Sequence, residues 1–367
     1  MTGKERFKKL VDAGREGKNI GLSTGSAKLG LYMDDYLPGT SYLIGGASGS
    51  GKSSFMLEKF IYNPLQDFLN DESKRDRDPY WILFSLEMTQ EQVYAKLCSM
   101  YIYDKYGIQL KFKEMFSRGK DCMLSDEHYE ILNGEIDDFL DILDKRLIFH
   151  EGVLTEEIYM TTLNEELKRF GKFSGNQYIA NNPQQIIGVV IDHCSLVKAT
   201  NGRTKKDEMD AISRDSVIIR NKTKIVSPIH VSQFNRSSNS DERLKQSMQA
   251  PNASDYKDSG ALYEDSQVVI ALFSPHKYSL NSYHGYNIKV LEQAFIAVYL
   301  LKSRFGTSDL WIPFGFYGDC SRYYELPRPD TINDWDKYRF PEWTFKKNLD
   351  TEENNKIESN TGFKFKM

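Results

Sequence analysis

The sequence predicts an α/β protein with a mostly parallel central sheet and helices on both faces. Short, almost purely apolar segments alternate along the chain with longer stretches of helical periodicity. These segments lack the in-and-out alternation of half-exposed strands, which indicates strands that are buried on both faces. The predicted strands are residues 42–46, 81–86, 146–150, 188–192, 229–233 and 268–273.

Composition and charge are those of a globular protein without a general attraction for polyanions. The 367 residues include 48 Lys+Arg and 52 Asp+Glu, with a formal net charge of −4, so any nucleic-acid binding must come from local patches. The hydrophobic fraction of 40% is typical of a folded domain. No segment approaches the roughly 18 apolar residues of a membrane span, and the N-terminus lacks a secretory signal. We therefore expect a cytoplasmic protein.

Changes in composition divide the chain into three parts. Residues 1–20 are predicted to be a linker containing an amphipathic helix, whose apolar positions include Phe7 and Leu10 and should pack on the next domain or on a neighbouring subunit. Residues 21–330 carry the alternating strand and helix pattern. Residues 331–367 lose this pattern and are predicted to be a C-terminal extension with a mobile, polar tail.

Several other segments have simple interpretations. Residues 71–78 and 237–254 are polar and rich in structure breakers, which predicts surface loops. The insertion at residues 99–183 is long. Aromatic side chains in two places are interpreted as core, interface or docking residues: Tyr101, Tyr103, Tyr106, Trp335 and Trp343. The cysteines are far apart and without C-x-x-C spacing, which predicts free thiols instead of a disulfide framework or zinc ribbon: Cys98, Cys122, Cys194 and Cys320.

A phosphate-binding loop is the clearest motif. It follows the apolar strand 42–46 and precedes a helical pattern, which is the context that a P-loop requires. Its glycines allow backbone N–H groups to surround phosphates, Lys52 can reach the outer phosphates, and Ser53 supplies a hydroxyl to Mg²⁺. The alternative is a glycine- and serine-rich turn. The nucleotide-binding residues are Gly46, Ala47, Ser48, Gly49, Ser50, Gly51, Lys52, Ser53 and Ser54.

Three further polar residues follow predicted strands. Asp192 ends an apolar strand and is the best candidate for the second group of a Mg²⁺ site. Glu87 follows another strand and could orient or deprotonate an attacking water, and Gln233 could contact a γ-phosphate or hold water. Ligands bind at the carboxyl edge of open α/β sheets, so these residues should meet the P-loop. Strands often end in polar residues that only cap turns, which is the alternative for each residue taken singly.

With these motifs in this order, the sequence resembles the DnaB-like replicative helicases, whose motor domain has a RecA-like fold. The resemblance covers roughly residues 5 to 325 and is specific because it combines GLSTGSAKLG, SLEM followed by Glu91 and Gln92, VVIDHCSL, SQFNR and LLKSRFG. It implies a ring-shaped, usually hexameric ATPase that uses ATP and Mg²⁺ and moves along single-stranded DNA.

The resemblance also implies roles for individual residues. Asp192 would belong to the Mg²⁺ site, Glu87 would be the catalytic base and Gln233 the γ-phosphate sensor. Arg304, assisted by Lys302, would reach into the neighbouring subunit's site and stabilise charge on the transferred phosphoryl group. The alternative is that both are only basic residues flanking a strand.

DNA contacts implied by the resemblance lie in three loops that would line a central channel. The family usually has an Arg-Glu pair where this chain has Lys257 and Asp258, so the charge at Lys257 is retained without the bidentate fork. Solvated loops of mixed charge are the alternative. The candidate DNA-binding residues are Arg203, Lys205, Lys206, Arg236, Arg243, Lys245, Lys257, Asp258 and Gly260.

The sequence therefore predicts an ATP-dependent, ring-forming DNA helicase that acts in replication. Two alternatives stay open: a RecA-like DNA-dependent ATPase that loads or remodels DNA without processive unwinding, and a nucleotide-binding assembly subunit. Family members normally carry an N-terminal helical or primase domain, whereas only residues 1–20 precede the motifs here. We expect either that this domain sits on another protein, such as a primase or loader, or that the chain is a single-domain variant of the kind found in phages and mobile elements. A phage-encoded protein would act in the host cytoplasm.

Overall fold

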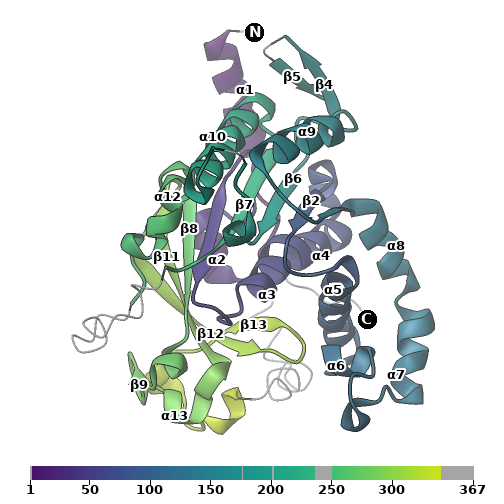
Figure 1. Ribbon diagram of the computed structural model, residues 1–367, viewed down its shortest axis with the longest axis vertical. Coiled ribbons are helices and arrows are strands. Elements are labelled where there is room, and N and C mark those ends of the chain that lie inside the picture. Colours follow the sequence, from purple (N-terminus) through teal and green to yellow (C-terminus); the bar gives the residue numbers. More distant parts are fainter. Residues whose placement is uncertain (1, 176, 201, 236–249, 340–367) are drawn as a thin grey trace.

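The computed structural model describes residues 2–175, 177–200, 202–235 and 250–339, and its centre is a nine-stranded sheet (Figure 1). The strand order is β13-β12-β11-β8-β1-β7-β6-β2-β3. All six predicted strands are present and pair in parallel. They are β1 (Tyr42–Gly46), β2 (Tyr80–Ser85), β3 (Leu147–Glu151), β6 (Ile187–Asp192), β7 (Val226–Gln233) and β8 (Val268–Phe273).

Three antiparallel strands, which the sequence analysis did not predict, extend the sheet beyond β8. They are β11 (Phe295–Ser303), β12 (Leu310–Tyr317) and β13 (Arg322–Glu325). Two small antiparallel pairs lie outside this sheet, β4 (Gly171–Ser174) with β5 (Gln177–Ala180) and β9 (Ser282–Tyr283) with β10 (Tyr286–Asn287). The sheet is therefore mostly parallel, with an antiparallel side next to β8.

Helices cover both faces of the sheet, as predicted. The described α-helices are α1 (Gly3–Arg15), α2 (Ala27–Met33), α3 (Lys52–Leu57), α4 (Asn63–Asn70), α5 (Gln90–Tyr106), α6 (Phe112–Met115), α7 (Asp126–Glu130), α8 (Asp137–Arg146), α9 (Glu156–Leu167), α10 (Lys205–Thr223), α12 (Gly260–Asp265) and α13 (Ile288–Leu291). Two π-helical turns occur at Glu58–Tyr62 and Ile131–Glu135. Short 3₁₀ turns lie at Glu72–Arg77, Lys120–Cys122, Cys194–Leu196, Ala253–Ser259, Pro275–Tyr278, Glu292–Ala294, Pro329–Thr331 and Asp336–Tyr338.

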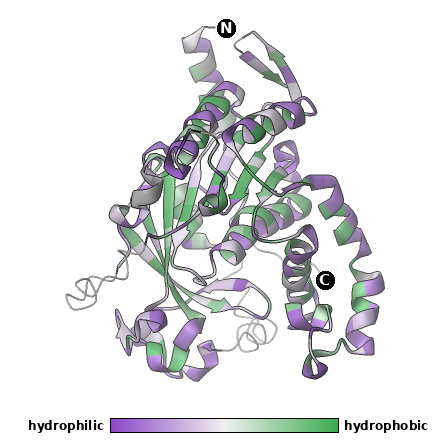
Figure 2. Cartoon of the chain, in the orientation of Figure 1, coloured by the Kyte–Doolittle hydropathy of each residue, from purple (hydrophilic) through white to green (hydrophobic). Residues whose placement is uncertain are grey.

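A hydrophobic core lies on each face of the parallel strands. Successive residues of a strand point to opposite faces, so Ile44 joins the core shared with α3, α4, α5 and α8, whereas Leu43 joins the core shared with α9, α10 and α12. Figure 2 shows the hydrophobic strands at the centre and helices with mixed, largely hydrophilic outer surfaces. Burial on both faces is the reason that these strands are largely apolar.

Helix α1 does not bury its apolar face against the described part of the chain. Phe7, Leu10 and Val11 are 67%, 60% and 47% exposed, and α1 lies at one end of the molecule (Figure 1). The predicted loop at residues 71–78 is instead largely a 3₁₀ turn. It ends in Arg77, which is buried because its guanidinium donates hydrogen bonds to backbone carbonyls of the segment that links α1 to the sheet.

The insertion at residues 99–183 contains most of α5, then α6 to α9, β3 and the β4–β5 pair. Its tyrosines belong to the core, as predicted: Tyr103 is buried, and Tyr101 stacks on Phe139 with 4.4 Å between ring centroids. Trp335 packs on Tyr286. Trp343, the expected tail and the segment 236–249 lie outside the described residues.

The four cysteines are free thiols, and three of them are buried. Burial raises the pKa of Cys98 to about 12, so this thiol stays protonated at neutral pH. Among the described helices, none is long and apolar enough to cross a membrane.

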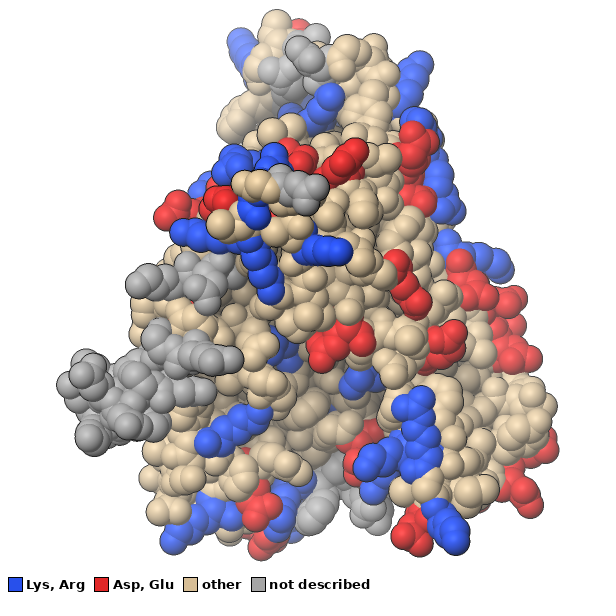
Figure 3. Space-filling model, viewed as in Figure 1, with Lys and Arg blue, Asp and Glu red and all other residues tan. Residues whose placement is uncertain are grey.

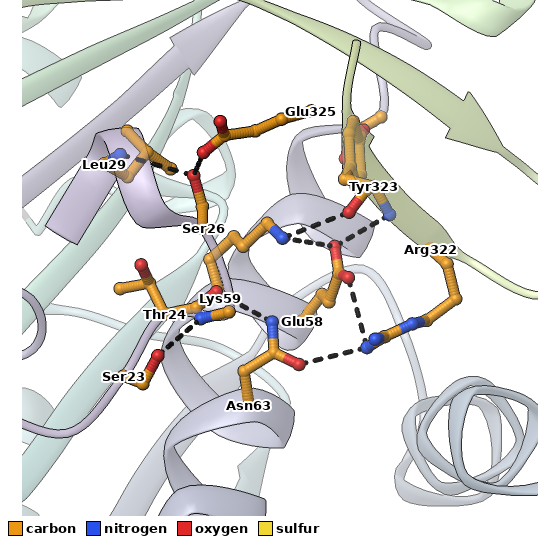
Figure 4. A network of polar contacts seen from close by, with 12 residues as sticks. Ser23, Thr24, Ser26, Leu29, Glu58, Lys59, Asn63, Arg322, Tyr323 and Glu325 are labelled. Carbon is orange, nitrogen blue, oxygen red and sulfur yellow. Dashed lines mark hydrogen bonds and ion pairs between the residues drawn. The ribbon is translucent and has the colours of Figure 1, made fainter. Parts of the chain in front are cut away.

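A buried network of charges lies beneath the helix that follows the P-loop (Figure 4). The Glu58 carboxylate lies 3.1 Å from Arg322 Nη1 and 3.4 Å from Lys59 Nζ, and it accepts a hydrogen bond from the Tyr323 backbone N–H. Arg322 also pairs with Asp104 of α5 at 3.2 Å. Buried charges are costly unless they are paired and hydrogen-bonded, and these pairs link β13 and α5 to this helix.

A buried histidine should make folding sensitive to acid. Burial lowers the pKa of His230, on β7, to about 4, with Asp265 opposing this shift, and its ring lies 3.3 Å from Ser216 Oγ. An unfolded histidine titrates near pH 6.5, so between about pH 6.5 and 4 the unfolded state binds more protons. Stability should therefore fall as the pH drops through this window, by up to about 3 kcal/mol from this group.

The measurement is the unfolding free energy from urea titrations at several pH values. His230→Gln should flatten the decline between pH 6.5 and 4, even if it lowers stability at pH 8. His276→Gln serves as the matched control because His276 is exposed. An equally steep decline in His230→Gln would show that other groups cause the acid sensitivity.

Candidate nucleotide-binding site

The P-loop connects the carboxyl end of β1 to the N-terminus of α3. α3, the π turn and α4 continue as one helical run from Lys52 to Asn70. Gly49 and Gly51 have φ of 65° and 85°, a left-handed region that favours glycine. A Cβ atom on Gly46 would lie 2.4 Å from Ser50 Oγ and 3.0 Å from the Leu272 carbonyl oxygen, so this glycine is required for close packing.

Lys52 is buried at this loop. Its ammonium donates a hydrogen bond to the Ala47 carbonyl at 2.9 Å. Burial lowers the pKa of Lys52 to about 8, and the nearby Asp192 and Glu87 carboxylates oppose this shift. A phosphate oxygen would replace the carbonyl as a stronger, charge-assisted partner for the ammonium.

Asp192 ends β6 beside Ser85 and is only 4% exposed. Burial raises its pKa to about 6, and the proximity of Ser53 and Lys52 opposes this shift. Neither carboxylate oxygen makes a hydrogen bond of normal geometry to any described residue. A buried carboxylate next to the Ser53 hydroxyl is a donor set of the oxygen type that Mg²⁺ or its bound water prefers. Ser53 and Asp192 therefore fit a Mg²⁺ ion that accompanies a bound nucleotide.

Glu87 lies two residues beyond β2, and its side chain is 58% exposed. Its carboxylate is 3.6 Å from His193 Nε2 and close enough to Lys52 and Asp192 to influence their pKa values. Gln233 ends β7, where it pairs with Gly46 of β1. The structure thus brings the predicted strand-end residues and the P-loop together at one edge of the sheet.

Three residues that the sequence analysis did not select also lie at this edge. Lys96, on α5, places its ammonium 3.1 Å from Ser54 Oγ. His193 follows Asp192 directly and contacts Glu87. Lys277 donates a hydrogen bond to the P-loop backbone. His193 could have been found by its position next to Asp192, whereas the two lysines depend on contacts between distant segments.

Lys302 and Arg304 lie away from the P-loop of this chain. Ser303 pairs with Val268, the first residue of β8, and Val268 pairs with Tyr42, the first residue of β1. Arg304 follows β11 at this amino edge of the parallel strands, whereas the P-loop lies at the carboxyl edge. The Lys302 ammonium donates hydrogen bonds to the carbonyls of Tyr263 and Glu264, at 3.0 and 2.7 Å.

The residues selected for DNA binding have different surroundings. Arg203 forms ion pairs with Glu156 and Glu208 at 3.1 and 3.5 Å. Lys205 and Lys206 begin α10 instead of lying in a loop, because Thr204 and Asp207 form a capping box. Figure 3 shows basic side chains over α10 and its surroundings, interspersed with acidic ones.

The second and third DNA loops are described only in part. Lys257 and Asp258 lie in the 3₁₀ turn Ala253–Ser259, and Gly260 begins α12. This turn is joined to the end of β7 by a hydrogen bond from the Asn235 backbone N–H to the Asp255 carbonyl, at 3.0 Å. Arg236, Arg243 and Lys245 lie outside the described residues.

A P-loop at the carboxyl edge of a mostly parallel sheet, with acids at the ends of neighbouring strands, defines a RecA-like nucleotide-binding fold. The sequence matches the DnaB-like helicase C terminal domain family over residues 21–325, and the chain belongs to this family. The resemblance inferred from the motifs is thereby confirmed. No curated protein matches the sequence.

Solved structures share the fold at low sequence identity. One, titled as an ATPase domain, has a TM-score of 0.66 and 16% identity, covering 89% of this chain and 99% of that chain. Another comes from "The Structure Of A DnaB-Like Replicative Helicase And Its Interactions With Primase", with a TM-score of 0.61 and 18% identity, covering 89% of this chain and 67% of that chain. These similarities support the RecA-like fold.

Proposed function

We propose that the chain is the motor of an ATP-dependent, ring-forming DNA helicase that translocates on single-stranded DNA during replication. Membership of the DnaB-like family supports the general activity. Within the chain, the P-loop, Asp192 and Glu87 share one edge of the sheet, where they would hold ATP with Mg²⁺ and activate water. In this role Gln233 contacts the γ-phosphate.

The placement of Arg304 is the observation that favours assembly into a ring. It lies at the amino edge of the strands that carry the P-loop at their other end, so a single chain has no access to its own finger. In a ring, the Arg304 side of one subunit faces the P-loop side of the next. The exposed apolar face of α1 gives a second contact, in which residues 1–20 dock on a neighbour.

Single-stranded DNA would occupy the channel of a hexamer, close to α10 and the turn at Ala253–Ser259. In this proposal residues 21–330 are the motor domain and 331–367 an extension. One structural relative is titled as a helicase with interactions with primase, which makes a primase, or a loader, a reasonable partner for this chain.

The test combines three measurements on one preparation: ATP hydrolysis with and without single-stranded DNA, strand displacement on forked DNA, and particle mass with a non-hydrolysable ATP analogue. DNA-stimulated hydrolysis, strand displacement and a hexameric mass together support the proposal. Hydrolysis without displacement would favour a DNA-remodelling ATPase, and nucleotide binding without turnover would favour an assembly subunit.

The DNA contacts make a prediction about salt. Replacing Lys205 and Lys206 together with alanine should weaken binding of all single-stranded sequences alike and reduce the slope of log affinity against log salt. Each lost phosphate contact should lower the slope by about 0.7. The measurement is fluorescence anisotropy of labelled oligonucleotides at several salt concentrations.

The matched control replaces Lys145 and Lys289, two exposed lysines on α8 and α13. This control should retain the wild-type slope. A wild-type slope in the Lys205 and Lys206 double variant would place the DNA on another surface.

A further inference from the structure

A second lysine contacts the phosphate loop, besides Lys52. Lys277 lies in the 3₁₀ turn Pro275–Tyr278 that follows β8, and its ammonium donates a hydrogen bond to the Ser48 carbonyl. The Lys52 ammonium donates to the preceding carbonyl, that of Ala47. Two cations from distant parts of the chain therefore sit on successive carbonyls of one loop.

The fold brings Lys277 to this position through the sheet. β8 pairs with β1, with Leu272 beside Gly46, so the turn after β8 emerges next to the P-loop. Tyr278 stacks on Phe273 with 5.1 Å between ring centroids, which anchors the turn to its strand. A Cβ atom at residue 49 would lie 2.9 Å from Lys277 Nζ, so glycine at this position leaves room for the ammonium.

The two ammonium groups repel each other. Both are held on the same loop, at the carbonyls of Ala47 and Ser48. Burial lowers the pKa of Lys277. Within the described parts of the chain, no carboxylate forms an ion pair with Lys277. An anion bound in the loop would relieve this repulsion and supply the missing counter-charge.

We propose that Lys277 binds the phosphates of the nucleotide directly, as a second phosphate-binding lysine from the same subunit. When the nucleotide enters, the ammonium exchanges the Ser48 carbonyl for a phosphate oxygen, as Lys52 exchanges that of Ala47. This inference rests on the proposed function of the site as an ATP site. Lysine acts on phosphates as a point charge, so its contribution grows with the charge of the ligand.

The test is equilibrium binding of a fluorescent ATP analogue, with inorganic tripolyphosphate as a competitor. Lys277→Ala should weaken the binding of both ligands by roughly ten- to hundredfold, the range for a hydrogen bond between charged groups. Lys277→Arg should retain most of the affinity because it keeps the charge. Lys289→Ala is the control, since Lys289 is an exposed lysine of α13.

Lys277→Gln separates phosphate binding from support of the loop, because a glutamine amide can still donate to the Ser48 carbonyl but carries no charge. A loss as large as in Lys277→Ala supports the proposal, and wild-type affinity in Lys277→Gln overturns it. Wild-type affinity in Lys277→Ala would overturn it as well, while leaving the proposed function intact. If the wild-type protein itself failed to bind ATP, the proposed function would fail.

Discussion

Glu87→Gln should leave nucleotide binding nearly unchanged and lower ATP turnover by roughly a hundred- to ten-thousandfold, the range attributed to general acid–base catalysis. Glu87 lies beyond the end of β2, with its side chain exposed beside the P-loop lysine. An exposed carboxylate at this edge can accept a proton from water, whereas the glutamine amide cannot. The substitution preserves the size of the side chain, so the fold and the phosphate contacts of Lys52 should persist.

Two measurements on Glu87→Gln check this expectation: phosphate release in the presence of single-stranded DNA, and equilibrium binding of an ATP analogue. Glu91→Gln is a matched control, because Glu91 is an exposed glutamate in the first turn of α5, four residues further along the chain. Turnover in Glu87→Gln that equals the wild-type rate would remove Glu87 from the chemistry. Loss of nucleotide binding would instead show that the charge of Glu87 is needed for the nucleotide to bind.

The sequence predicted the parallel half of the sheet because burial on both faces favours apolar residues at most positions of a strand. The same logic could not predict β11 to β13. β11 is apolar over most of its length, but apolarity does not specify whether a strand pairs in parallel or antiparallel. For the β11–β12 and β12–β13 pairs, the antiparallel direction follows from the short connections between the strands.

Some residues of the candidate site could likewise be predicted from the sequence, whereas others could not. Residues at or just beyond the ends of strands, such as Asp192 and Glu87, were predicted because a parallel sheet collects strand ends at one edge. Lys96 and Lys277 were missed because they approach the P-loop from 42 and 229 residues away along the chain. Their positions depend on how α5 and the turn after β8 pack, which no local pattern records.

One error could have been avoided from local sequence alone. Lys205 and Lys206 were assigned to a loop, although Thr204 and Asp207 have the spacing of a helix capping box. The helical placement fixes the two lysine side chains on the first turn of α10. Their proposed contact with DNA therefore comes from the end of a rigid element.

Arg304→Ala should lower DNA-stimulated ATP turnover by roughly a thousand- to hundred-thousandfold in assembled rings, the range for arginine fingers. Arg304 is exposed after β11, at the start of the strand next to β1, whereas the P-loop lies at the other end. About six residues of strand separate these edges by roughly 20 Å, beyond the reach of an arginine side chain. If Arg304 is the finger, as proposed, it must act in the site of a neighbouring subunit.

The measurement is turnover in rings whose mass has been verified, with Arg328→Ala as a control, because Arg328 is an exposed arginine outside the sheet. Mixing Arg304→Ala subunits with Lys52→Ala subunits adds a second readout. Interfaces that combine an intact P-loop with an intact finger should recover part of the activity that both variants lack alone. The decisive result is the simpler one: full DNA-stimulated turnover in verified Arg304→Ala rings would contradict a finger acting between subunits.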